Sequence, residues 1–394
     1  MYMFKQIPES DIPDGNTGLH VVMSAYIGIT LCCLGFLGNL ISILVWKRIN
    51  RQRHDSSKSA GMFLIALAFV DTGLLIFFTA TEGFQNISTD AQNSYVYVWF
   101  FCYIGFPVYF FFILASVWLV VSITYNRFIA VVLPHRAASM NTVRKSYIII
   151  FTTIILAFLT NIPHFFNYRP VRNVQNTWNI VETEYGKSFS AVMYDFWGHC
   201  IVLVLVPWIL IFVLNLLIIR KLYQRRPVRT KGKSSKEHQT TVILLTISFS
   251  FLLCLMWQCL VQCFYMLQFK SDDKDAWYHI STAYAPARVA LVLNSSINFI
   301  LYCLSGQMFR KEMYTMFAEW FRCDNYRQFL DSSTTISRTN TVSRSGYSTS
   351  SAADLKSTSH GGVEDSTKEY RDEEAINSGD DERHSPTKGE NYTV

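Results

Sequence analysis

The sequence predicts an all-α membrane protein: a bundle of seven transmembrane helices, followed by a short amphipathic eighth helix and a disordered cytoplasmic tail. Three observations lead to this prediction. Of the 394 residues, 50% are hydrophobic and only 16% are charged, which is too apolar for a typical soluble domain of this length. Seven long runs contain at most one charged residue each. Polar residues, with many Ser and Thr, fill the end of the chain.

The apolar runs are long enough to cross a bilayer, because about 20 helical residues span roughly 30 Å of hydrocarbon. Soluble core helices rarely run this far without charge. The runs cover residues 21–46, 60–81, 91–126, 146–168, 196–219, 238–269 and 276–309. We therefore expect an extracellular N-terminus (1–20), a transmembrane bundle (21–305), an amphipathic membrane-surface helix (306–323) and a disordered tail (324–394).

The charges of the connecting loops predict the orientation. The loops after the first, third and fifth runs are rich in Lys and Arg, whereas the alternate loops are acidic or mixed. Since positive loops stay in the cytoplasm, we expect a multi-pass protein of the plasma membrane with its N-terminus outside. The sequon Asn86-Ile87-Ser88 then lies in an outer loop, which makes Asn86 a candidate glycosylation site.

Polar side chains at bilayer depth are candidate functional residues, because burying them is costly. One carboxylate with several neutral oxygens suits a small hard cation. A satisfied polar network that only fixes helix packing is the alternative, and the spacing leaves both open. The residues concerned are Asp71, Ser116, Asn294, Ser295 and Asn298.

Several marks in order along the chain resemble the rhodopsin-like (class A) G-protein-coupled receptors, over about residues 21–322. These marks are Gly38-Asn39, Leu67-Ala68 with Asp71, Cys102 followed by Arg127, Pro207, and the segment from Asn298 to Tyr302. The resemblance implies that the five polar residues form the family's allosteric sodium pocket. It also implies an activation switch, which comprises Asn126, Arg127, Phe128, Glu237, Phe251 and Tyr302.

The chain departs from the family pattern at several positions. Asn126 stands where the family has an acid, and Leu255 and Trp257 replace the usual Trp and Pro of the sixth span. The loop from about 169 to 195 has no Cys. We therefore expect Cys102 to be a free thiol and the loop to be held less firmly than by a disulfide.

The predicted ligand pocket comprises Glu82, Tyr109, His199 and Arg288. The last run has no Lys, which argues against a retinal Schiff base. By the resemblance, Tyr109 stands where amine-binding members carry an Asp, which argues against an amine ligand. The segments 161–166 and 293–303 resemble invertebrate FMRFamide-type neuropeptide receptors. Glu82 would then meet a ligand Arg and Arg288 a ligand carboxylate or ring. Pairing of the two with each other is the alternative.

The cytoplasmic end predicts further partners. Apolar residues from Phe309 to Phe321 share one helical face, which favours a helix lying on membrane lipids. Cys323 is a candidate palmitoylation site, with an unmodified thiol as the alternative. The Ser/Thr-rich tail cannot bury enough apolar surface to fold, and it is a candidate substrate for a receptor kinase that prepares arrestin binding.

The predicted function is a receptor that passes an extracellular peptide signal to heterotrimeric G proteins. The sequence shows no Gly-rich phosphate loop, metal-spaced His or Cys, or catalytic triad, so we expect no enzyme and no cofactor besides sodium. The net charge of +6 is too small to indicate nucleic acid. The alternatives are a non-coupling decoy or scaffold, and a transporter or channel, although Asp71 and Arg288 are few charges for the latter.

Overall fold

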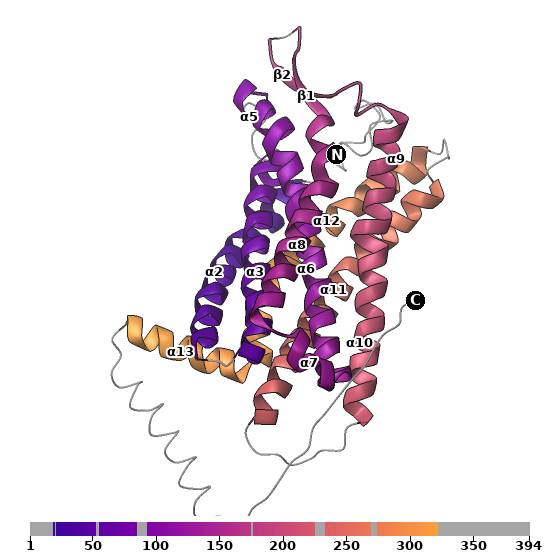
Figure 1. Ribbon diagram of the computed structural model, residues 1–394. Coiled ribbons are helices and arrows are strands. Elements are labelled where there is room, and N and C mark those ends of the chain that lie inside the picture. Colours follow the sequence, from indigo (N-terminus) through magenta and orange to yellow (C-terminus); the bar gives the residue numbers. More distant parts are fainter. Residues whose placement is uncertain are drawn as a thin grey trace, which may run out of the picture. The chain divides into compact units, whose positions relative to one another are not determined.

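The computed structural model describes residue 19 and residues 21–52, 55–84, 93–174, 176–224, 233–268 and 274–321. Helices make up most of these ranges, together with one two-stranded sheet. Figure 1 shows the helices side by side in a bundle, with the sheet at one end and α13 lying across the other. We call these the hairpin end and the α13 end.

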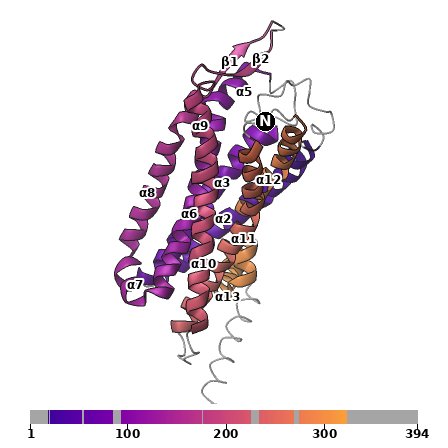
Figure 2. The same ribbon diagram turned by 90° about the vertical axis from the view of Figure 1, so that its right-hand side faces the viewer.

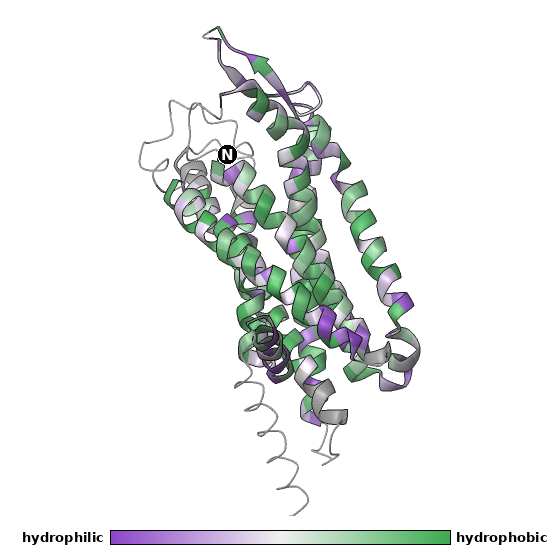
Figure 3. Cartoon of the chain, turned by 90° about the vertical axis from the view of Figure 1, so that its left-hand side faces the viewer, coloured by the Kyte–Doolittle hydropathy of each residue, from purple (hydrophilic) through white to green (hydrophobic). Residues whose placement is uncertain are grey.

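Seven helices within the described residues are long and apolar enough to cross a membrane. They cover Val21–Arg51, Lys58–Gly83, Tyr95–Val132, Val143–Phe166, Phe189–Gln224, Thr240–Phe264 and Thr282–Ser305. Figure 3 shows apolar residues along the middle of the helices and more hydrophilic ones at the sheet and near α13. The predicted fold class is confirmed.

Several spans combine a regular α-helix with a π-helical or 3-10 segment. The α-helices are α2 (Ile29–Arg51), α3 (Asp55–Phe78), α5 (Tyr95–Phe100), α6 (Phe106–Val132), α7 (Pro134–Met140), α8 (Val143–Asn161), α9 (Phe189–Trp197), α10 (Val206–Gln224), α11 (Lys233–Gln268), α12 (Lys274–Ser305) and α13 (Gln307–Trp320). The other segments are η3 (Val21–Gly28), η4 (Thr79–Gly83), η5 (Phe101–Gly105), η6 (Ile162–Phe166) and η7 (Gly198–Leu205). Figure 2 shows α8, α10 and α11 along the bundle from a second side.

Two glycines let α2 approach α12 closely. A Cβ atom at Gly35 would collide with Ser296, and one at Gly38 would come within 2.8 Å of the Phe299 side chain. Small residues at helix contacts are the usual means of close packing in membranes, where lipid removes the hydrophobic drive between helices. The Gly35 and Gly38 positions thus bring the first and seventh spans together.

Aromatic rings anchor α13 to the bundle. Trp46, Tyr302 and Phe309 are fully buried, and their ring centroids lie 5.2 to 5.7 Å apart. Because Phe309 belongs to α13 while the other two belong to α2 and α12, three helices share one aromatic cluster. This accounts for the burial of the apolar face of α13.

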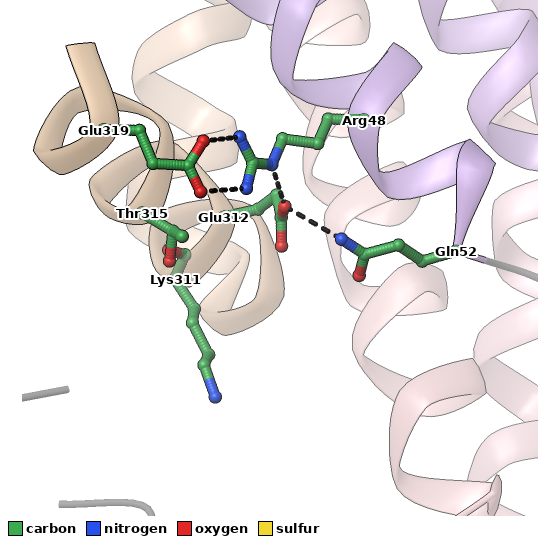
Figure 4. Close-up of polar contacts among 6 residues, drawn as sticks. All are labelled: Arg48, Gln52, Lys311, Glu312, Thr315 and Glu319. Carbon is green, nitrogen blue, oxygen red and sulfur yellow. Dashed lines mark hydrogen bonds and ion pairs between the residues drawn. The ribbon is translucent and has the colours of Figure 1, made fainter. Parts of the chain in front are cut away.

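Charged side chains fasten the outer face of α13 to α2. Arg48 donates from Nε to Glu312, and its two terminal nitrogens bind the carboxylate of Glu319 in a bidentate pair. Gln52 Nε2 also donates to Glu312, at 3.1 Å. Figure 4 shows the guanidinium of Arg48 between the two carboxylates. Such fork-shaped pairing fixes direction as well as distance, so it orients α13 relative to α2.

At the hairpin end, β1 (Tyr168–Arg172) and β2 (Trp178–Glu182) pair antiparallel, with Tyr168 opposite Glu182 and Arg172 opposite Trp178. Asn176, at φ 67°, lies in the turn between them; Asn tolerates this left-handed conformation better than most residues.

Apolar packing holds this hairpin to the third span. Cys102 is a free thiol and fully buried. It packs with Val98 and with Tyr168 of β1, and Phe106, Trp178 and Ile180 surround this cluster. Cys102 is therefore the free thiol that we expected. Hydrophobic packing, rather than a disulfide, joins the hairpin to the third span at this residue.

Removing the ring of Tyr168 should destabilise the chain. Tyr168 is 6% exposed, and truncation of a buried aromatic side chain typically costs about 3 to 5 kcal/mol. Tyr168→Ala should therefore lower the thermal unfolding midpoint of the purified chain by several degrees, while Tyr147→Ala, at a residue 64% exposed, should change it little. Reducing agent should leave the wild-type midpoint unchanged. A drop with reductant as large as that of Tyr168→Ala would reveal a disulfide instead.

Candidate functional site

The carboxylate of Asp71 is the centre of a buried polar site. Asp71 lies on α3 and is 0% exposed. Its Oδ1 accepts hydrogen bonds from Ser116 Oγ at 2.6 Å and Ser295 Oγ at 3.0 Å, and its Oδ2 accepts one from Asn298 Nδ2 at 2.8 Å. The donors belong to α6 and α12, so three helices meet at one carboxylate. Four of the five predicted pocket residues are in direct contact.

The remaining predicted residue, Asn294, is buried at 8% exposure, but the hydrogen bonds described for Asp71 do not include it. Asn39 is a site residue that we did not predict. Its Nδ2 donates to the backbone oxygen of Ser295 at 3.0 Å, which joins α2 to the same place. The signal was present in the sequence, since Asn39 is a polar residue in the middle of an apolar run.

The oxygens of this site fit a small hard cation. A carboxylate with hydroxyl and amide oxygens is the donor set that such ions prefer. The hydroxyls of Ser116 and Ser295 are rotors, so they can turn their hydrogens away and present lone pairs. Asn39 Oδ1 is buried and has no hydrogen-bond partner in the structure. It is therefore a further oxygen close to Ser295 whose acceptor capacity is unused.

A neutral amide accepts a hydrogen bond from the predicted switch residue Arg127 at the α13 end of α6. Arg127 is 9% exposed and donates from Nη2 to Asn126 Oδ1 at 3.2 Å. Asn126 Nδ2 in turn donates to Ser59 Oγ at 3.1 Å and to Asn141 Oδ1 at 3.0 Å. Ser59 also shares a hydrogen bond with Ser146 at 2.7 Å. Asn126 thus links the third span to the second span and to the following loop without a negative charge.

The structure describes the side chains of three of the remaining four predicted switch residues. Phe251 and Tyr302 are nearly fully buried and belong to the same apolar core. Phe128 is half-buried, and its ring stacks on Tyr125 at 6.5 Å, so the structure does not place it in that core. The side chain of Glu237 lies outside the described residues, so its place in the activation switch stays a prediction.

Opposite charges meet near the hairpin end. Arg288 Nη1 forms an ion pair with Glu82 Oε2, and their side chains are only 17% and 19% exposed. This is the alternative in which the two predicted ligand contacts pair with each other. Tyr109 is buried at 4% exposure and lies close enough to interact electrostatically with both charges. The side chain of His199 lies outside the described residues.

A second polar cluster at the hairpin end escaped the sequence prediction. His164 Nδ1 lies 3.5 Å from Asp195 Oδ1, and Asn167 Nδ2 donates to Asp195 Oδ2 at 3.2 Å. The ring of His164 stacks on Phe110 at 5.0 Å. The cluster joins the ends of the fourth and fifth spans at the base of the hairpin. A lone His and a lone Asp far apart in sequence gave no signal of this contact.

Two predicted modification sites, Asn86 and Cys323, lie outside the described residues. Both therefore stay predictions.

Comparison with known proteins places the chain in a family. The model of the 7 transmembrane receptor (rhodopsin family) matches residues 38–302. The chain is 25% identical over 296 residues to the FMRFamide receptor of Drosophila melanogaster, covering 71% of this chain and 50% of that receptor. It is 29% identical over 143 residues to the FMRFamide peptide receptor frpr-18 of Caenorhabditis elegans, covering 36% of this chain and 32% of that protein.

A third relative is the Rhodopsin, GQ-coupled, of Mizuhopecten yessoensis, which is 24% identical over 347 residues, or 82% of this chain and 65% of that protein. The matched part thus spans half of the Drosophila receptor and about a third of the Caenorhabditis one. The family model covers the chain from the first to the seventh span and includes Asp71, Arg127 and Arg288. The chain therefore belongs to the rhodopsin family of seven-transmembrane receptors.

Proposed function

We propose that this receptor binds an extracellular peptide, similar to FMRFamide, and passes the signal to a heterotrimeric G protein. The observation that carries the proposal is the match to the rhodopsin family in a chain with two relatives named for FMRFamide peptides. The Glu82–Arg288 pair at the hairpin end supplies the two opposite charges that such a peptide would contact by separating them. The peptide offers a basic side chain and several acceptors, so it can replace either partner of the pair.

The proposed orientation puts the hairpin end outside the cell at the plasma membrane. Basic residues favour the cytoplasmic side, and Arg48 and Arg51 lie in the last turn of α2, next to α13. The same reasoning applies to Lys221 in the last turn of α10. The ligand then approaches Glu82 and Arg288, while the G protein approaches Arg127.

The third span offers a route between these ends. Tyr109, Ser116 and Arg127 are all buried on α6. They lie at the level of the ion pair, at Asp71 and at the amide network of Asn126, respectively. A small displacement of α6 would therefore change the contacts at the ion pair, at Asp71 and at Asn126 together, because packed helices shift as units rather than deform.

Nucleotide exchange in membranes that express the full chain tests this proposal. Pools of amidated peptides, including FMRFamide-like ones, should stimulate exchange on at least one G protein of a panel, whereas amines should not. Arg127→Ala should reduce the stimulated rate by about tenfold or more, because coupling free energies between sites commonly reach this size.

Surface expression of the wild-type chain and of Arg127→Ala is the control for folding. A well-expressed wild-type chain that stays silent with every peptide and every G protein would favour the non-coupling decoy or scaffold. The replacement of the usual residues by Leu255 and Trp257 motivates this second candidate.

Charge exchange between Glu82 and Arg288 separates ligand contact from internal pairing. Each single variant, Glu82→Arg and Arg288→Glu, should lower peptide potency by about a hundredfold, because each leaves like charges in a little-exposed site. The double variant remakes the pair with reversed polarity. It should recover the thermal stability of the purified receptor but not the peptide potency. Full recovery of potency would show that the ligand touches neither residue.

We also propose that Na⁺ occupies the site around Asp71, held by Asp71, Ser116, Ser295 and Asn298. A bound cation would supply a positive charge at a carboxylate that the membrane interior cannot solvate. It would thereby hold α3, α6 and α12 in one arrangement and act as an allosteric stabiliser.

Replacing Na⁺ by N-methylglucamine at equal ionic strength should lower the unfolding midpoint of the wild-type receptor. At a sodium concentration ten times the Kd, binding contributes about 1.4 kcal/mol. Asp71→Asn should abolish the difference between the two salts. Ser248→Ala, which removes a buried hydroxyl bonded within its own helix, should retain it. An equal sodium effect in Asp71→Asn would place the ion elsewhere.

The remaining proposed partners and modifications lie at the two surfaces of the membrane. A receptor kinase would phosphorylate the Ser/Thr-rich tail and so create an anionic surface for arrestin. Lipids would contact α13 and an acyl chain on Cys323, and a glycan would occupy Asn86 on the outside. Mass spectrometry of the chain from native membranes tests all three modifications, and unmodified peptides would contradict them.

A further inference from the structure

The loop between the third and fourth spans carries cations and no acid. Arg136, Arg144 and Lys145 are all exposed, and no Asp or Glu occurs between residues 128 and 181. In the proposed orientation this loop faces the cytoplasm, because it follows the α13 end of α6. A group of exposed cations attracts anions, and the loop itself supplies no carboxylate to bind them.

Ser139 presents an exposed hydroxyl near the end of α7. This helix has only seven residues, Pro134–Met140, and so short a helix has little stability of its own. The Oγ of Ser139 donates to the backbone oxygen of Arg136 at 3.0 Å, a local bond within one turn. Because this segment can open without disturbing the packed spans, the hydroxyl is accessible to a modifying enzyme.

An arginine lies three residues before this hydroxyl. Protein kinases select their substrates by patterns of charge, and carboxylates in a kinase cleft bind the guanidinium of an arginine at a fixed distance from the reacting hydroxyl. Thr142 lacks this arrangement, because Ser139 is the residue three positions before it. Its Oγ also accepts from the backbone N–H of Lys145 as the N-cap of α8. Ser139, rather than Thr142, therefore fits a kinase that selects arginine.

Cations lie within reach of a phosphate on Ser139. Lys145 reaches back from the first turn of α8, and its Nζ donates to the backbone oxygen of Ser139 at 2.8 Å. Arg136 lies three positions before Ser139 on α7, a spacing at which helical side chains are neighbours. A phosphoryl group carries about −1.5 to −2 charges and three acceptor oxygens, so it can bind both cations. An anion near the C-terminus of a helix is unfavourable, but this effect is weaker than two charge-assisted hydrogen bonds.

The same loop is joined to the third span through Asn141. This residue is 7% exposed, and its Oδ1 accepts a hydrogen bond from Asn126 Nδ2 at 3.0 Å. Asn126 in turn accepts from Arg127. Asn141 lies between Ser139 and Lys145 in the chain, so an ion pair between those two residues would restrict its movement. A phosphate on Ser139 would thereby act on the residues beside Arg127.

We propose that Ser139 is the substrate of an arginine-selecting protein kinase, and that its phosphate binds Lys145 and Arg136, rigidifies the loop and lowers G-protein coupling. The Oγ of Ser139 attacks the γ-phosphorus of ATP and forms an O–P bond. The bond from this phosphorus to the β–γ bridging oxygen breaks, ADP leaves, and the hydroxyl proton passes to the catalytic Asp of the kinase. The inference rests on the proposed function, because it needs the α13 end to face the cytoplasm and meet a G protein.

The test uses the full-length receptor in lipid nanodiscs, which leave both faces accessible, so that phosphorylation does not depend on the orientation in the cell. The receptor is incubated with the catalytic subunit of cAMP-dependent protein kinase and Mg-ATP, and a standard peptide substrate is included in the same reaction. Trypsin then releases residues 137–144, in which Ser139 and Thr142 are the hydroxyl-bearing residues. Mass spectrometry locates the phosphate.

Phosphate should accumulate on Ser139 and not on Thr142. Arg136→Gln should lower the initial rate at Ser139 by about tenfold or more, because it removes a charge-assisted contact with the kinase. Arg144→Gln, at an exposed arginine on the other side of Ser139, should change this rate less than twofold. Absence of phosphate from Ser139 while the standard substrate is phosphorylated would overturn the inference, and so would equal effects of the two substitutions.

Amide hydrogen exchange over residues 134–145 measures the effect of the phosphate on the loop. Phosphorylation should slow this exchange about two- to fivefold in wild type, the size of an exposed ion pair. It should not slow it in Lys145→Gln, since glutamine keeps a hydrogen-bond donor but has no charge for the phosphate. Unchanged amide exchange in wild type phosphorylated at Ser139 would contradict the proposed ion pairs.

Peptide-stimulated nucleotide exchange measures the effect on coupling. Kinase treatment should lower the stimulated rate about two- to fivefold in wild type and leave it unchanged in Ser139→Ala, which controls for phosphate on the tail. An equal loss in both receptors would overturn the role of Ser139. If no receptor responds to any peptide, the proposed function fails, and the location of the phosphate together with amide exchange decides the inference.

Discussion

A carboxylate in the middle of a membrane bundle constrains everything around it. Water cannot solvate Asp71 there, so the helices must supply its partners. Three donors on α6 and α12 do so. Asn39 then fixes the backbone of Ser295 from α2, and the glycines of α2 allow the close approach that this bond needs. The relative positions of four helices therefore follow from satisfying one side chain.

At two places in this chain, a neutral contact replaces a stronger interaction. At the hairpin end, Cys102 packs on Tyr168 and has no disulfide partner among the described residues. Near the α13 end, Asn126 accepts from Arg127 where the family has an acid, and a neutral acceptor binds a guanidinium more weakly than a carboxylate does. Each substitution keeps the geometry with interactions that are easier to break.

Among the described residues, ion pairs are found at the two ends of the bundle. Arg48 binds Glu312 and Glu319 beside α13, and Arg288 binds Glu82 near the hairpin. Between them, α12 carries Arg288, Ser295 and Tyr302 at intervals of seven residues, so one helix joins the ion pair, the Asp71 site and the aromatic cluster on α13. These ion pairs lie where the side chains are partly exposed, whereas the carboxylate of Asp71 and the aromatic cluster are buried and are held by hydrogen bonds and ring packing.

The sequence alone determined the class of fold. A membrane admits few structures, and the length of each apolar run shows whether it can cross the bilayer as a helix. It also identified Asp71, Ser116, Ser295 and Asn298, since polar residues are rare at bilayer depth. It left open whether Glu82 and Arg288 pair, and it missed Asn39 at Ser295 and the contact of His164 with Asp195. Only the tertiary structure decided these contacts, because each joins residues on different helices. Which face a helix presents, and at what depth, depends on packing against its neighbours rather than on its own periodicity.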